Sequence, residues 1–155
     1  MKYITSILVF LLVIISACDP PIDVSRPGDK LSGYVTHIDS ILYMNGGYYS
    51  ISIYNADSTN PFNRVPVRTD SLNLTRRDWL FETPFTMEGV PSGRYYIAAT
   101  WSTYPKIPNE IPLVLGTHGC DTNSNCSNHK MVVYPNHEGK FRNLFAWTDP
   151  AKRLY

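Results

Sequence analysis

The last third of the sequence carries four side chains that could bind a metal ion or form a disulfide bond. They are His118, Cys120, Cys126 and His129. Zn²⁺ favours four nitrogen or sulfur ligands, but the spacing His-x-Cys-x5-Cys-x2-His matches none of the common zinc-finger patterns. In an exported protein, two cysteines of this kind form a disulfide more often than they bind a metal ion. We therefore expect a Cys120–Cys126 disulfide, keep a zinc site and two free thiols as alternatives, and assign neither a metal ligand nor a cofactor.

The residues between the two cysteines contain oxygen ligands at the spacing that begins a calcium-binding loop. Asp121, Asn123 and Asn125 occupy the first, third and fifth positions of such a loop. Cys126 stands at the sixth position, where a glycine is needed, and Val132 stands at the twelfth, where a glutamate is needed. We therefore expect an exposed polar loop in preference to a calcium site.

The sequence contains no recognised catalytic pattern. It has no Gly-x-Ser-x-Gly segment, no His-Glu-x-x-His segment and no glycine-rich phosphate loop. Glu82 and Glu88 could act as paired carboxylates, but alternation along a strand places them on the solvent side, where acidic residues usually lie. We therefore expect a protein that is not an enzyme, with no catalytic residue.

Aromatic side chains offer a different kind of site. They make up 13% of the residues, and tyrosine is the most frequent among them. Tyr43, Trp101 and Tyr104, together with other tyrosines, could form a platform for sugar rings, because aromatic rings combine a large apolar face with a polar edge. The alternative, which we favour, is that most of these rings fill the core of the domain.

Length and charge limit the possible partners. The chain has 155 residues, which favours one domain. Its 14 basic and 13 acidic residues nearly balance, whereas a nucleic-acid-binding domain is usually basic. We therefore expect no nucleic-acid partner.

The N-terminus has the layout of an export signal. Lys2 supplies positive charge, residues 7–15 form a continuous apolar run, and the small residues Ser16 and Ala17 precede Cys18. The apolar run is shorter than the ~20 residues that a membrane-spanning helix needs. Residues 1–17 are therefore predicted to be a signal peptide.

The segment Ile15-Ser16-Ala17-Cys18 resembles the lipobox of bacterial lipoproteins. The resemblance implies that the Cys18 sulfur receives a diacylglycerol, that the signal is removed, and that acyl chains hold the protein on a membrane of the cell envelope. We expect the outer membrane or the cell surface in preference to the inner membrane. Residues 18–30, which contain three prolines, are expected to form an extended tether, followed by a domain over 31–150 and a short tail over 151–155.

The body of the chain alternates apolar and polar residues with a period of two, which predicts half-buried strands. The candidate strands lie within residues 33–38, 49–54, 72–74, 79–88, 95–101, 111–115, 130–134 and 141–147. Pro84 would break the hydrogen-bond ladder of a central strand, so its strand is expected at a sheet edge or with a bulge. Strands of this number and spacing predict an all-β, antiparallel β-sandwich of about seven or eight strands.

The segment from Phe85 to Ala99 goes beyond this pattern. It contains Gly89-Val90-Pro91-Ser92-Gly93 followed by Tyr95-Tyr96, and it resembles the signature hairpin of carboxypeptidase regulatory-like domains. The resemblance implies an Ig-like sandwich of the transthyretin-like (prealbumin) type, in which the hairpin places Tyr95 and Ile97 in the core. We expect Pro91 to favour the turn and Gly93 to adopt a positive φ.

These features predict a lipid-anchored, non-catalytic protein that serves as a structural or protein-interaction module of the cell envelope. Its partners would be the membrane and other envelope proteins. One alternative is a surface lipoprotein that binds a glycan through exposed aromatic residues. Another is a small metal-dependent enzyme that uses His118, Cys120, Cys126 and His129.

Overall fold

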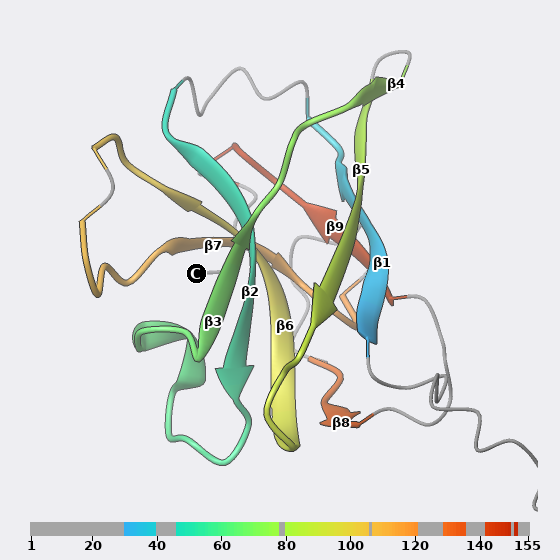
Figure 1. Ribbon diagram of the computed structural model, residues 1–155. Helices are drawn as coiled ribbons and strands as arrows, with labels where there is room; N and C mark the ends of the chain where they lie inside the picture. Colours follow the sequence, from blue (N-terminus) through green and yellow to red (C-terminus); the bar gives the residue numbers. More distant parts are fainter. Residues whose placement is uncertain are drawn as a thin grey trace, which may run out of the picture.

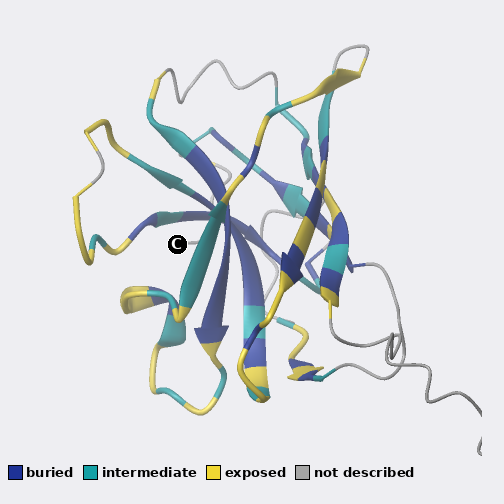
Figure 2. Ribbon diagram, in the orientation of Figure 1, coloured by how far each residue is buried: buried dark blue, intermediate teal, exposed yellow. Residues whose placement is uncertain are grey.

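Two β-sheets pack face to face in the part of the chain that the computed structural model describes (Figure 1). The described residues are 30–39, 46–77, 80–105, 107–120, 129–135, 142–149 and 151. Their elements, in chain order, are β1 (Lys30–His37), β2 (Tyr48–Asn55), the short 3-10 helix η1 (Pro61–Asn63), β3 (Arg68–Ser71), β4 (Arg76–Arg77), β5 (Leu80–Glu88), β6 (Gly93–Ser102), β7 (Leu113–Thr117), β8 (Val132–Tyr134) and β9 (Arg142–Ala146). Buried residues follow the strands, and exposed ones are concentrated in the connections (Figure 2).

The first sheet has the strand order β4-β5-β1-β9, and the second has the order β3-β2-β6-β7, with β8 paired to the start of β6. Neighbouring strands of the described residues are antiparallel, except that β1 and β9 are parallel. The predicted all-β sandwich is therefore confirmed. The prediction did not include the parallel pair or the two-residue strand β4, which is too short to show an alternating pattern.

Strand β5 follows its predicted alternation. Thr83, Phe85 and Met87 are buried, whereas Pro84 and Thr86 between them are exposed. At Pro84, β5 pairs with β1, and the short β4 pairs with β5 only near its beginning. The other edge of β5 is therefore open at the proline, as predicted, and no ladder hydrogen bond is lost there.

Strands β2 and β6 differ from the prediction because both of their faces are buried. Tyr49, Ile51 and Ile53 of β2 point between the sheets, but the alternate residues of β2 are also buried. Phe62 of η1 covers one end of this outer face, where it forms a second apolar cluster. That cluster consists of Tyr54, Phe62, Ala98 and Val114, with Tyr96 packed against it.

The β5–β6 hairpin is stabilised by its own residues. Gly89 has φ +64°, a value that a residue with a side chain rarely adopts. The Tyr95 hydroxyl donates a hydrogen bond of 2.8 Å to the Pro91 carbonyl oxygen, and Ile97 lies in the core as predicted. The prediction of a positive φ at Gly93 was wrong, because Gly93 already begins β6 and Gly89 makes the turn.

Two predicted strand segments are corrected. β3 ends at Ser71, whereas Leu72 and Leu74 were expected to mark a strand; Leu72 keeps one backbone hydrogen bond to β2. In β9 the most deeply buried side chains are Leu144 and Ala146, whereas Phe145 and Trp147, which suggested the strand, are half-buried, and Phe141 lies outside the described residues.

β9 lies between β1 and β7. A side chain added at Gly33 of β1 would place its Cβ 1.7 Å from the Arg142 carbonyl oxygen of β9. A Cβ at Gly116 of β7 would lie 1.9 Å from the Phe145 carbonyl oxygen. Glycine within a strand often marks such a close approach of another backbone, so both positions exclude every other residue unless β9 moves.

Replacing Gly116 with alanine is expected to destabilise the fold by about 3 kcal/mol or more, because the new methyl group overlaps a backbone oxygen that cannot swing away. Urea unfolding of the two proteins measures the difference. Gly89→Ala is a matched control, since its Cβ would meet nothing within 4 Å and it carries only the left-handed backbone cost of about 1–2 kcal/mol. Equal effects of the two substitutions would contradict the close approach of β9 to Gly116.

His37 is a polar residue inside the core. It is 0% exposed, its ring meets Tyr49 edge-on at 5.2 Å, and neither ring nitrogen has a hydrogen-bond partner in the part of the chain that the structure describes. Burial lowers the pKa of His37 to about 4, although the nearby Asp39 carboxylate acts in the opposite direction. The folded protein therefore holds His37 in its neutral form.

Acidification is expected to destabilise the protein through His37. The pKa is about 6.5 in the unfolded chain and about 4 in the folded one, so the folded state binds fewer protons in this range. The free energy of unfolding therefore has its full value above pH 6.5. It falls as the pH drops toward 4, by about 3 kcal/mol in total.

Urea unfolding at a series of pH values measures this loss, and His37→Leu should make the pH dependence shallower. An NMR titration in which the His37 imidazole protonates near its usual pKa would contradict the prediction.

Candidate functional site

Several predicted site residues lie outside the described residues. They are the predicted lipidation site, one member of the aromatic platform, one partner of the predicted disulfide and the polar loop before it: Cys18, Tyr43, Cys126 and residues 121–125. The leader and most of the tether, residues 1–29, also lie outside. The lipid anchor and the Cys120–Cys126 disulfide therefore stay predictions.

Cys120 lies in a small cluster with Thr117 and His129. The Thr117 hydroxyl is 2.9 Å from His129 Nδ1 and 3.1 Å from Cys120 Sγ. Thr117 is 0% exposed, so its hydroxyl is fixed and orients the His129 ring. Burial lowers the pKa of His129, which favours a neutral imidazole at neutral pH.

His118 has different neighbours. Burial lowers the pKa of His118, the positive charges of Arg142 and Lys130 act in the same direction, and a hydrogen bond to the backbone of Asn143 in β9 opposes the shift. In the described part of the chain, no group of three or more His, Cys, Asp and Glu side chains could hold a metal ion. Cys126, one of the four residues of the zinc alternative, lies outside the described residues, so the zinc alternative stays a prediction.

The aromatic residues predicted to form a platform are divided between the two faces of the second sheet. Trp101 lies across from Tyr49, packs against the core between the sheets, and donates a hydrogen bond of 2.9 Å from Nε1 to the Gly46 carbonyl. Tyr104 is 75% exposed and contacts Tyr48, whose ring centroid is 5.8 Å away. Tyr48 and Tyr49 are adjacent in β2 and point to opposite faces, so Trp101 and Tyr104 do not share one flat surface.

An aromatic pocket with a volume of ≈ 300 Å³ lies on the outer face of the second sheet. The described residues that line it are Asn60, Pro61, Phe62, Asn63, Tyr96 and His129. The centroids of Phe62 and His129 are 5.1 Å apart in an edge-on contact. The Tyr96 ring lies 5.7 Å from Phe62 and 6.0 Å from His129, so three rings meet at this pocket.

Helix η1 positions Phe62 in the aromatic pocket. Asn60 has φ +49°, a left-handed conformation that asparagine tolerates better than most residues. Pro61 supplies the φ angle of the first helical position, and the Asn63 N–H donates to the Asn60 carbonyl at 3.1 Å to close the turn. The other side of the Phe62 ring packs edge-on against Tyr54 at 5.3 Å. One turn thus anchors the ring and leaves two asparagines at the pocket.

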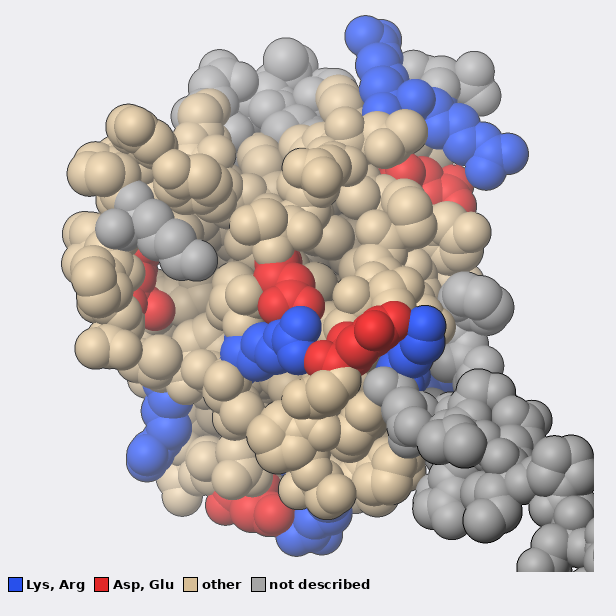
Figure 3. Space-filling view, in the orientation of Figure 1, with Lys and Arg blue, Asp and Glu red and all other residues tan. Residues whose placement is uncertain are grey.

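A second feature is an apolar surface on two loops, residues 56–67 and 103–112. Five of the eight large apolar side chains that are exposed in the described residues lie there: Val65, Val67, Tyr104, Ile107 and Ile111. We call these five residues the loop surface. Both loops lie on the left of Figure 1, and the left side of the space-filling view is mostly uncharged (Figure 3).

A hollow of ≈ 140 Å³ separates the two loops. Its described lining includes Val65, Pro66, Ile107, Pro108, Pro112 and one acidic residue, Glu110. Glu110 Oε1 accepts hydrogen bonds of 3.4 Å from the N–H and the hydroxyl of Thr103. Glu110 Oε2 is buried and has no hydrogen-bond partner among the described residues. The hollow therefore combines a largely apolar lining, which also includes Thr69, Ser102 and Asn109, with a carboxylate oxygen that can still accept a hydrogen bond.

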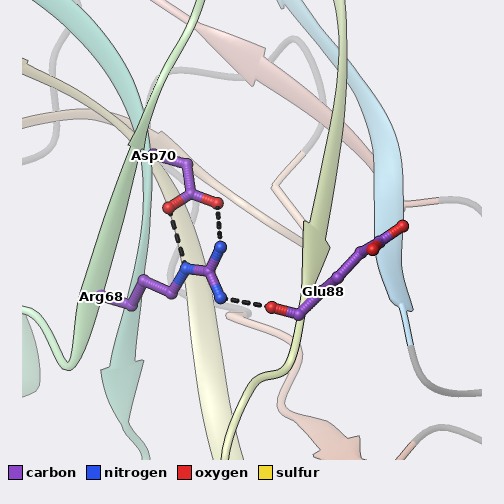
Figure 4. Close-up of polar contacts among 3 residues, drawn as sticks. All are labelled: Arg68, Asp70 and Glu88. Atoms are coloured by element: carbon purple, nitrogen blue, oxygen red, sulfur yellow. Dashed lines mark hydrogen bonds and ion pairs between the residues drawn. The ribbon is translucent and has the colours of Figure 1, made fainter.

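A third feature connects the two sheets where β3 faces β5 (Figure 4). Arg68 of β3 binds the Asp70 carboxylate through Nε and Nη2, each at 2.8 Å, and donates from Nη1 to the Glu88 carbonyl of β5. A hollow of ≈ 290 Å³ lies beside this bridge. Asp70 is the one charged residue among its described lining, and Arg68 already neutralises it, so we assign the bridge a structural role.

Reasoning from the sequence missed the aromatic pocket and Glu110. Tyr96 was expected on the polar face of its strand, and Phe62 was not considered, because Phe62 belongs to no motif. The Asn60-Pro61 turn was a usable signal, since it implies a chain reversal that can fold Phe62 back over β2 and β6.

Searches of protein-family models, of curated proteins and of solved structures found no match for this chain. Within the part of the chain that the structure describes, no helix has the length and apolar character needed to cross a bilayer. The functional argument therefore depends on the residues and geometry described above.

Proposed function

We propose that this protein is a lipid-anchored, non-catalytic module of the bacterial cell envelope that binds another envelope protein. The observation that carries the interaction is the loop surface, which has five exposed apolar side chains, two of which, Val65 and Ile107, line a hollow. The lipobox supports the anchor, and the Gly89–Gly93 hairpin supports a transthyretin-like type of sandwich.

The length of the tether suits a module held near a membrane. Cys18 carries the lipid in this proposal, and the first strand begins at Lys30. The intervening residues, if extended by the prolines among them, span about 30 Å. This distance lets the domain reach a membrane-bound partner while the acyl chains remain in the bilayer.

The loop surface has the composition of a protein-binding surface. Apolar side chains that cluster in one area of an otherwise polar surface commonly mark an interaction site. Tyr104 and Ile107 are among the most exposed of them, at 75% and 56%. Binding would remove these side chains from water, and each Å² of apolar surface buried contributes about 25 cal/mol.

The hollow specifies the chemistry of the partner. Its lining is largely apolar, and Glu110 Oε2 needs a donor that the described residues do not supply. A lysine or arginine side chain satisfies both requirements, because its methylene stem packs on apolar walls and its charged end donates to a carboxylate. The proposed partner therefore presents an apolar segment with one basic side chain.

The anchor is tested by replacing Cys18 with alanine. In cells supplied with a labelled fatty acid, we expect the label on this protein to disappear and the protein to leave the membrane fraction, because no other residue receives the diacylglycerol. Cys126→Ser is the control and should keep the label. Unchanged labelling of the Cys18→Ala protein would contradict the anchor.

The partner is tested by photo-crosslinking in cells from position 107 of the loop surface. We expect one envelope protein to be crosslinked from this position and not from position 133, where Val133 is equally exposed at 56% on β8. With both proteins purified, Ile107→Asp should abolish binding, and Glu110→Gln should weaken it about tenfold, or about 1.4 kcal/mol.

Both substitutions lie at positions where the fold itself should change by less than about 0.5 kcal/mol, so thermal unfolding is the control for folding. Equal crosslinking from positions 107 and 133, or crosslinking only to a second copy of this chain, would contradict an envelope partner at this surface.

A further inference from the structure

We propose that the aromatic pocket binds one ring of a neutral sugar, independently of the protein partner at the loop surface. The pocket has a volume of ≈ 300 Å³, which lies at the small end of the range for small-molecule sites. Such a volume suits a single pyranose ring, such as the terminal residue of a glycan, better than a longer chain.

The three rings supply the apolar part of the site. Phe62, Tyr96 and His129 meet at centroid distances between 5.1 and 6.0 Å and all line the pocket. A sugar ring has one face that consists largely of C–H groups, and this face can pack on an aromatic ring, which is flat and apolar. The rings are preformed, because Phe62 packs on Tyr54 and Thr117 fixes His129.

The polar part of the site is suited to hydroxyl groups. Asn60 and Asn63 flank Phe62 and line the pocket, and each side-chain amide can both donate and accept hydrogen bonds. Neighbouring hydroxyls of a sugar need such a combination, because every hydroxyl is itself a donor and an acceptor. A pocket with rings alone would instead favour a fully apolar ligand.

The absence of charge among the described lining residues determines which sugars fit. None of the six is an acid, a lysine or an arginine, and burial lowers the pKa of His129, so the imidazole adds no positive charge at neutral pH. An acidic or phosphorylated sugar would lose part of its hydration without gaining a counter-charge. A neutral hexose or N-acetylhexosamine is therefore the preferred class.

The test is NMR titration of the purified domain with methyl glycosides of glucose, galactose, mannose and N-acetylglucosamine. We expect at least one of them to bind with a Kd of about 1–10 mM, as is usual for a single small ring with few contacts. The amide signals of Asn60, Phe62, Asn63, Tyr96 and His129 should shift. Glucuronic acid should bind at least tenfold more weakly than the best neutral sugar, about 1.4 kcal/mol.

Substitutions locate the site. Tyr96→Ala should weaken binding at least tenfold, about 1.4 kcal/mol, and Asn63→Ala, at an exposed position, should weaken it without affecting the fold. Tyr104→Ala removes an equally large ring from the loop surface and should leave sugar binding unchanged. Loss of binding in Tyr104→Ala but not in Tyr96→Ala would overturn the proposal, as would the absence of shifts with every sugar up to about 50 mM. Neither result bears on the protein partner, which is measured separately.

Discussion

The close approach of the β9 backbone to two glycines is the constraint on which the rest of the structure depends. β9 pairs with β1 on one side, and beyond its end the Trp147 N–H donates to the Leu115 carbonyl of β7 at 2.9 Å. One strand thus connects both sheets, which requires that Gly33 and Gly116 have no side chain. Where β3 faces β5, by contrast, the Arg68 side chain provides the connection. The sandwich is joined by backbone at one edge and by a side chain at the other.

This arrangement leaves the outer face of the second sheet to be covered by loops. The centre of that face is polar: the Ser52 hydroxyl lies 3.0 Å from the hydroxyl of Thr69 and 2.8 Å from that of Thr100. Buried hydroxyls are tolerated because they are hydrogen-bonded to one another, but they offer little apolar area for a covering loop. The loop over residues 56–67 therefore attaches mainly through Phe62. Its remaining apolar side chains, including Val65, point outward and become available for binding.

The sequence was sufficient to predict the fold class because alternation depends only on neighbouring residues. It located β5 and the core residues Tyr95 and Ile97 for this reason. It could not predict the burial of both faces of β2 or the need for glycine at position 116, since both depend on segments far away in the chain. The same limit applies to the site. Glu110 is ordinary in sequence, and its unpaired oxygen results from the way the two loops face each other.

The loop surface and the aromatic pocket lie on the same side of the sheet but differ in how strongly they are coupled to the fold. The side chains of the loop surface are exposed, so their replacement changes stability little, and they are free to match a partner. Phe62 is 8% exposed, and removing a buried ring of this kind costs about 3–5 kcal/mol. The ligand specificity of the pocket must therefore come from its more accessible members, Asn60, Asn63 and Tyr96. Both features are built largely from loop residues, so either can diverge while Gly33 and Gly116 keep the two sheets joined.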